Sequence, residues 1–224
     1  MEDSKKYSGR IKQLFRSLKR RFSRPEPLLY DEPTEALIYG IVSEKITQEE
    51  AGSVIEKFKG HFVDLNDLRI SPVQEIVEIF SDNNETTRGT AFNITGVLKA
   101  IFDKYNTVSL AELRRIGKRP AREILSQLCS SRFAVDYCVL TSLGGHTIPL
   151  TAKMIEYLRT EELVNPPADH DDIEGFLARQ LAAKDAYSFY CLLRRQSEQG
   201  KTAEKGREKP KEKQKVKGKA AGTQ

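Results

Sequence analysis

The sequence predicts an all-α fold. Apolar residues recur at spacings of three and four over most of the stretch 33–195, which is the period of helices that bury one face. Motifs typical of helix starts separate these runs. Only residues 146–150, HTIPL, resemble an extended segment, so no sheet is expected.

About nine or ten helices are expected, joined mostly by short loops. The first is strongly apolar and covers 36–41. Thr47 and Glu50 have capping-box spacing, so their side chains can satisfy the free amides at the start of a helix that ends near Gly60. Ser71-Pro72 is expected to start another helix, with the proline at its first position. Further helices are expected over 88–105, 119–128, 134–143 and 186–193. Three more are expected to begin near positions 109, 151 and 171.

Charge divides the chain of 224 residues into three parts. Residues 1–24 carry nine Lys/Arg against two acidic residues, and residues 198–224 carry nine against four. The middle, 25–197, is acidic, with a net charge of −7, although the whole chain is at +5. A domain that binds nucleic acid usually has its own basic face. By net charge the middle is therefore a poor candidate, which does not exclude a local basic patch.

The two basic ends have different patterns. Residues 1–24 place apolar side chains at helical spacing, namely Ile11, Leu14, Phe15, Leu18 and Phe22. This pattern predicts either a basic amphipathic arm for nucleic acid or an anionic surface, or a helix packed on the domain. Residues 198–224 are rich in lysine and have almost nothing to bury, so we expect a disordered tail that attracts phosphates or serves solubility.

Several classes of protein are not expected. The chain has no apolar run of about eighteen residues, and its basic N-terminus lacks the apolar centre of a signal peptide, which favours a cytoplasmic protein that does not cross a membrane. The three cysteines, Cys129, Cys138 and Cys191, are odd in number and irregularly spaced. They suit reduced core thiols better than disulfides or a metal site. His61 and His170 have no partner at metal-ligand spacing, so neither a metal nor another cofactor is expected.

The segment Leu125 to Lys153 contains the most informative order of elements. It reads as a helix, a tight turn near 128–134, a buried helix, a Gly-Gly-His loop and the start of a further helix. This order resembles the helix-hairpin-helix (HhH-GPD) DNA glycosylases of the endonuclease III superfamily. Their hairpin reads roughly Leu-Pro-Gly-Val-Gly-x-Lys-Thr-Ala, and a later loop leads to Val-Asp-Thr-His. The resemblance covers about 33–195 and implies a two-lobed helical fold.

The family's chemical groups are absent from the matching positions. The resemblance puts Ala134 at the lysine and Thr151 at the aspartate, while Ser130 and Arg132 stand where the hairpin glycines would be. A neutral hydroxyl does not stabilise a cationic sugar as a carboxylate does. The iron–sulfur cysteines of some members are also missing. No catalytic residue is therefore assigned.

Two residues remain as candidates for substitute chemistry. Lys153 could supply an amine or contact a phosphate, and Asp136 could supply a carboxylate. An ordinary exposed lysine and a surface or helix-start acid are the simpler interpretations, and we favour them.

The resemblance also implies a set of residues that meet DNA. These are Lys45, Ser130, Ser131, Arg132, Phe133, His146 and Lys153. A second stretch, 113–119, also resembles the hairpin letters, with Gly117 in place. It leaves about thirty residues before Thr151, too many for one hairpin helix, so the later position is preferred. A lone histidine such as His146 is more often structural than catalytic.

The sequence therefore predicts a DNA-binding protein of DNA glycosylase fold, related to base-excision repair, that lacks the standard catalytic residues. One alternative is an active, divergent glycosylase or abasic-site lyase. Another is a protein–protein interaction module that no longer meets DNA, which the acidic middle favours. DNA is the expected partner, a protein partner remains open, and no small-molecule substrate is evident.

Overall fold

The computed structural model describes residues 4–199 and confirms the all-α fold, with no strand in that part of the chain. The predicted tail lies outside the described residues from 200 onward. The helices are α1 (Ser4–Arg21), α2 (Pro33–Ser43), α3 (Gln48–His61), α4 (Leu65–Ile70), α5 (Val73–Ile79), α6 (Glu85–Tyr105), the 3₁₀ helix η1 (Ala111–Arg115), α7 (Lys118–Leu128), α8 (Arg132–Thr141), α9 (Ala152–Thr160), α10 (His170–Gln180) and α11 (Ala183–Glu198).

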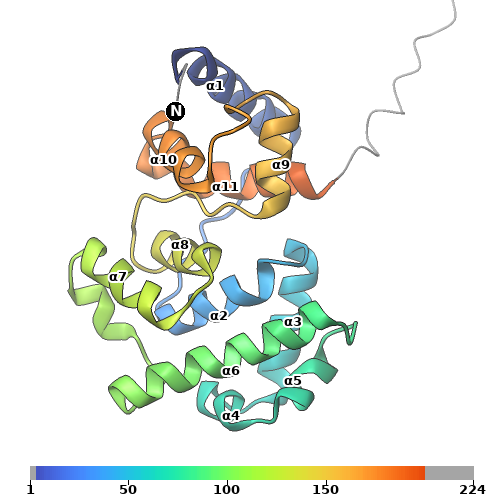
Figure 1. Ribbon diagram of the computed structural model, residues 1–224, viewed down its shortest axis with the longest axis vertical. Coiled ribbons are helices and arrows are strands. Elements are labelled where there is room, and N and C mark those ends of the chain that lie inside the picture. The colour runs from blue at the N-terminus through green and yellow to red at the C-terminus, as the bar shows by residue number, and fades with distance from the viewer. Residues whose placement is uncertain (1–3, 200–224) are drawn as a thin grey trace, which may run out of the picture.

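The helices form two lobes, one above the other in Figure 1. The upper lobe contains α1, α9, α10 and α11, and the lower lobe contains α2 to α8. The chain passes from the upper to the lower lobe after α1 and returns after α8. Each lobe is therefore built from segments that are distant in sequence, and the two ends of the described chain lie in the same lobe.

Helices α2 and α8 pack closely on each other in the lower lobe. A Cβ atom at Gly40 would lie only 2.7 Å from the Cα and 3.0 Å from the Cβ of Ala134. Contacts this short are not tolerated by a packed core. The two helix backbones therefore approach as closely as they do because position 40 has no side chain.

Helix α1 packs its apolar side against α10 and α11. Its buried side chains are Tyr7, Ile11, Phe15 and Leu18. The Phe15 ring meets the Phe189 ring edge-on at 5.4 Å. A chain that began at residue 25 would leave this part of the core uncovered, so the experiments below use the full chain.

The sequence motifs at helix starts predicted most of these starts to within about three residues of where the structure has them. The capping box of Thr47 and Glu50 is present as predicted. Three details differ from the expectation. Helix α4 was not predicted, because its six residues are too few to show a helical period. Pro72 occupies the N-cap of α5, one position before the first helical residue. The short element after Ser109 is a 3₁₀ helix.

Within the described chain no helix is both long and apolar enough to cross a membrane. Nor do its histidine, cysteine and acidic side chains gather into a group of three or more that could hold a metal ion. All three cysteines are buried and unbridged. Burial raises the pKa of the Cys129 and Cys191 thiols to about 11 each, so neither is a reactive thiolate near neutral pH.

Candidate functional site

A tight turn joins α7 to α8 at Cys129–Ser131. The amide of Cys129 donates to the Leu125 carbonyl and ends α7 at 2.9 Å. The Ser131 hydroxyl accepts from the Ala134 amide at 3.1 Å and starts α8. Cys129 is buried while Ser130 is exposed, so one side of the turn faces the core and the other faces solvent. The alternative stretch at 113–119 covers the end of η1, the two-residue connection 116–117 and the start of α7.

The ends of six helices, α2, α3, α7, α8, α9 and α11, meet at this turn. We call this region the helix-end junction and define it as Glu44–Thr47, Cys129–Ser131 and Thr151–Lys153, together with the last turn of α11. The Ser131 hydroxyl donates to Glu44 Oε2 at 2.9 Å, which ties α8 to the end of α2. The Gln48 amide donates to Glu198 at 3.1 Å, which ties α3 to the end of α11.

Three helices begin at the junction, and each is capped by a hydroxyl. The capping side chains are Thr47 for α3, Ser131 for α8 and Thr151 for α9. Helix N-termini carry partial positive charge and free amides, so they attract anions. The Thr47 backbone and hydroxyl hold the pKa of Glu50 below its usual range, with a smaller contribution from Lys153. Helix α9 packs on α11, whose last turn lies at the junction.

Arg194 on α11 joins the two lobes at the junction. Its guanidinium has no exposed surface and donates to the Ser43 and Ile46 carbonyls, the latter at 2.9 Å. It also donates to the Tyr190 hydroxyl at 2.9 Å and to Glu198 at 2.7 Å. Arg194 thus satisfies carbonyls left free at the end of α2, where a cation is also favoured by the helix dipole.

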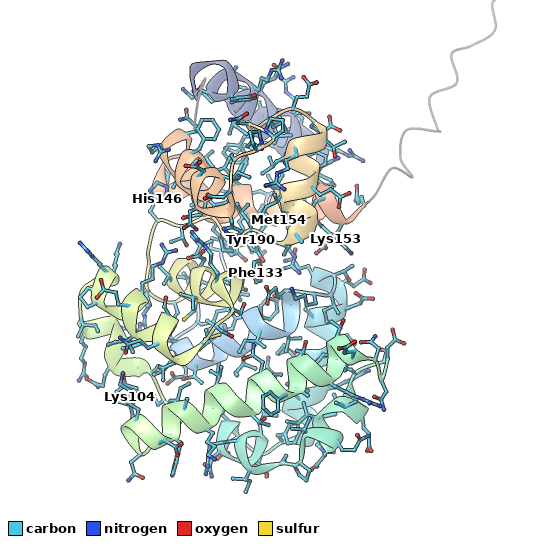
Figure 2. All side chains as sticks on the ribbon, viewed as in Figure 1. Lys104, Phe133, His146, Lys153, Met154 and Tyr190 are labelled. Carbon is cyan, nitrogen blue, oxygen red and sulfur yellow. The ribbon has the colours of Figure 1, made fainter. Side chains whose placement is uncertain are left out.

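Aromatic rings fill the contact between the lobes. The Tyr137 ring stacks on Tyr39 at 5.0 Å and meets the Tyr190 ring at 5.8 Å. Phe133 lies under the Arg194 guanidinium at 5.3 Å. Figure 2 shows Phe133, Tyr190 and Met154 close together where the lobes meet. Phe133 is 2% exposed, so its ring offers almost no surface to a ligand in this conformation.

Arg132, which follows the turn, is engaged by three carboxylates. It pairs with Asp171 and, at 3.3 Å, with Glu174, both on α10. Its Nε atom also lies 3.5 Å from Asp136. A guanidinium held in this way is largely neutralised for an outside anion. Sequence reasoning missed these contacts because the partners on α10 are about forty positions away.

Asp136 is not the surface charge that the sequence suggested. Its side chain is fully buried on α8, with Arg122 Nη2 at 2.6 Å. Burial raises the pKa of this carboxyl to about 6, with a contribution from Glu174, although Arg122 and Arg132 lower it. The folded state then binds this proton more tightly than the unfolded chain does, so ionisation of Asp136 lowers stability as the pH rises from about 4 to about 6.

Substitution of Arg122 tests this buried charge. We expect Arg122→Met to lower the free energy of unfolding by about 3 kcal/mol at pH 7, because the carboxylate loses its nearest cation. The loss is smaller at pH 5, where Asp136 takes up a proton. Urea unfolding at both pH values measures this. Arg119→Met, which removes an exposed pair with Glu123, is the control and changes stability by less than about 0.5 kcal/mol. Equal losses at both pH values for Arg122→Met would contradict the explanation.

The structure brings some of the predicted site residues together. Lys45 and Lys153 are exposed at the junction, with Ser130 exposed on the nearby turn. Lys45 lies 3.5 Å from Glu44. His146 is exposed too, but Figure 2 shows it on the opposite side of the molecule from Lys153.

The two positions that the resemblance gave to catalytic groups are both covered. Ala134 has no exposed surface and lies against the backbone of α2 at Gly40. Thr151 is 8% exposed, and its hydroxyl accepts from the Met154 amide at 3.3 Å. Both residues therefore have structural contacts: Ala134 in helix packing and Thr151 in capping α9.

Solved structures share this architecture. An endonuclease III–DNA complex matches with a TM-score of 0.66 and 16% identity, over 84% of each chain. A Clostridium acetobutylicum 8-oxoguanine glycosylase/lyase in complex with DNA matches with a TM-score of 0.66 and 12% identity, over 88% of this chain and 71% of that one. The 3-methyladenine DNA glycosylase MagIII from H. pylori matches with a TM-score of 0.62 and 14% identity, over 88% and 98%.

The chain therefore has the helical DNA glycosylase fold, as the resemblance implied. No protein-family model and no curated protein sequence matches it. At identities below 20% the likeness concerns the fold, and the function has to be argued from the site.

Proposed function

We propose that the protein binds duplex DNA through the helix-end junction and carries out no glycosylase or lyase chemistry of the usual kind. The observation that carries the proposal is the junction itself, where a helix-hairpin-helix turn and the starts of α8 and α9 lie beside exposed Lys45 and Lys153. Hairpin amides, helix N-termini and lysines are groups that contact phosphates in DNA complexes. Solved DNA complexes of the same fold support DNA as the partner.

The missing chemistry follows from the two covered positions. A lysine at position 134 would need space that the backbone of α2 occupies. Thr151 is neutral and already caps α9. Lys153 is exposed, which is not the desolvated setting that activates a lysine amine as a nucleophile. We therefore propose binding without bond cleavage. The buried, unbridged cysteines agree with a cytoplasmic location, which we include in the proposal.

The junction also holds acids, which limits its affinity for phosphates. Glu44, Glu49 and Glu50 lie among or next to its residues, and Arg132 is neutralised by α10. Binding should therefore be weak at physiological salt and rise steeply as salt is lowered.

Charge reversal at the junction tests the proposal. We expect Lys45→Glu/Lys153→Glu to weaken binding of the full chain to a duplex by at least about tenfold at low salt, since each contact to a phosphate depends on its cation. Fluorescence anisotropy with a labelled duplex measures the affinity. Lys57→Glu/Lys99→Glu makes the same charge change on α3 and α6, away from the junction, and should weaken binding much less. Equal effects of the two variants would contradict binding at the junction.

A protein–protein interaction module is the second candidate function. It is favoured by a cavity of about 690 Å³ that α2, α3 and α4 line with apolar and acidic side chains. Leu28 and Val63 line this cavity and are 43% and 92% exposed. If the full chain binds no duplex even at low salt, this function replaces the first.

A further inference from the structure

We infer that the outward face of α1 is a second phosphate-binding surface, which extends the DNA contact from the junction along the upper lobe. The inference rests on the proposed function, because it names a further part of the surface that meets the same DNA. We call this surface the α1 basic face and define it as Lys12, Arg16, Lys19 and Arg20 of the helix together with Arg24, which follows its end.

The α1 basic face is opposite the buried side of the helix. None of the eighteen residues of α1 is acidic. Lys12, Arg16 and Arg20 are exposed and follow one another at intervals of four, so they form a row with a rise of about 6 Å between neighbours. Like charges at this spacing destabilise an isolated helix by a few tenths of a kcal/mol per pair. The row therefore opposes helix stability unless an anion lies along it.

Most of these cations have no carboxylate partner. Among the described residues Lys12, Arg16, Arg20 and Arg24 form no ion pair, whereas Lys19 lies 3.2 Å from Asp185. This differs from the junction and from Arg132, where acids compensate the basic side chains. The α1 basic face is thus free to neutralise phosphates, which releases their counterions and favours binding.

A hollow between α1 and α11 adds depth to this surface. It has a volume of about 470 Å³, and its lining includes Lys19, Arg24, Lys184, the Phe22 ring and one acidic residue, Asp185. Lys19 is paired with Asp185, so Arg24 and Lys184 beside the Phe22 ring are the groups that suit the phosphates and sugars of a nucleic acid backbone.

A lipid surface fits α1 less well. A basic amphipathic helix binds membranes by burying its apolar side among the lipids. In α1 that side is already buried in the upper lobe, with Ile11 at 0% and Leu18 at 2% exposure. Only the charged side is available, which favours a polyanion such as DNA.

The α1 basic face adjoins the junction through the last turn of α11. Arg21 donates to Gln196 at 2.8 Å and to Gln199 at 3.2 Å, which ties the end of α1 to the end of α11. Glu198, in the same turn, binds the start of α3 at the junction. The ends of α1 and α11 therefore lie together beside the junction.

Neutralisation of the row tests the inference. We expect Lys12→Gln/Arg16→Gln/Arg20→Gln to weaken binding of the full chain to a duplex about 10- to 100-fold at low salt, and to reduce the slope of log K against log salt by about 2 to 3. The control, Lys57→Gln/Lys99→Gln/Lys104→Gln, makes the same charge change on the lower lobe and should alter the slope by less than about 0.5. Thermal unfolding confirms that both variants are folded.

The outcomes separate this inference from the proposed function. An unchanged slope in the α1 variant, with weak binding by Lys45→Glu/Lys153→Glu, would overturn the inference and leave the junction in place. A reduced slope in the α1 variant, with unchanged binding by Lys45→Glu/Lys153→Glu, would support the α1 basic face and remove the junction from the interface. A third outcome is that the unaltered chain binds phosphatidylglycerol vesicles but not the duplex, and that the α1 variant loses the vesicle binding. This outcome would overturn the inference in favour of a membrane partner.

Discussion

Replacement of Arg194 by methionine is expected to lower the free energy of unfolding by about 3 to 5 kcal/mol, which corresponds to a fall in Tm of about 10 °C for a chain of this size. The methionine fills part of the volume but donates no hydrogen bond. The Ser43 and Ile46 carbonyls at the end of α2 then lose their partner inside the protein, while the Glu198 carboxylate loses its cation and keeps only the Gln48 amide. Buried polar groups left without partners account for the size of the effect.

Arg195 provides a matched control for this prediction. It is the next residue on α11 but is exposed, so Arg195→Met should change the free energy of unfolding by less than about 0.5 kcal/mol. Thermal and urea unfolding of both variants give the comparison. Similar stabilities for the two would mean that Arg194 does not hold the lobes together.

The second large effect is expected at Gly40. Gly40→Ala places a methyl group 2.7 Å from the Cα of Ala134, and that atom belongs to the backbone of α8 and cannot rotate away. We expect a loss of about 2 to 3 kcal/mol, in the range found for overpacked cores. Urea unfolding measures it.

Gly96→Ala is the control for Gly40→Ala. Gly96 lies within α6, and a Cβ atom there would meet nothing within 4 Å. Alanine favours a helix by up to about 1 kcal/mol over glycine, so this variant should be stabilised. The same substitution thus has opposite signs at the two sites. A stabilised Gly40→Ala would contradict the close packing of α2 on α8.

The parts of the fold that the sequence predicted are those set by local interactions. The capping box of Thr47 and Glu50 needs only residues three apart, and it forms as predicted. The break between α7 and α8 lies within the expected 128–134. Helix α4 was missed because six residues give too short a pattern for helical periodicity.

The candidate site was harder to predict because its contacts are distant in sequence. Arg194 reads as one of two adjacent basic residues near the end of a helix, yet it contacts Ser43, 151 positions away. Asp136 was expected at the surface and is buried, because Arg122 on α7 allows a carboxylate inside. Local pattern carries no information on such pairings.

The most direct test of DNA binding without chemistry uses one duplex that contains an abasic site. The full chain is mixed with the duplex at low salt, and the mixture is divided between a gel-shift assay and treatment with borohydride. Borohydride reduces the imine that a protein amine forms with the sugar aldehyde, which leaves a covalent adduct. We expect a shifted complex, an intact strand and no adduct. An adduct or a cleaved strand would show that the protein is a lyase after all, and the absence of a shifted complex would contradict DNA binding.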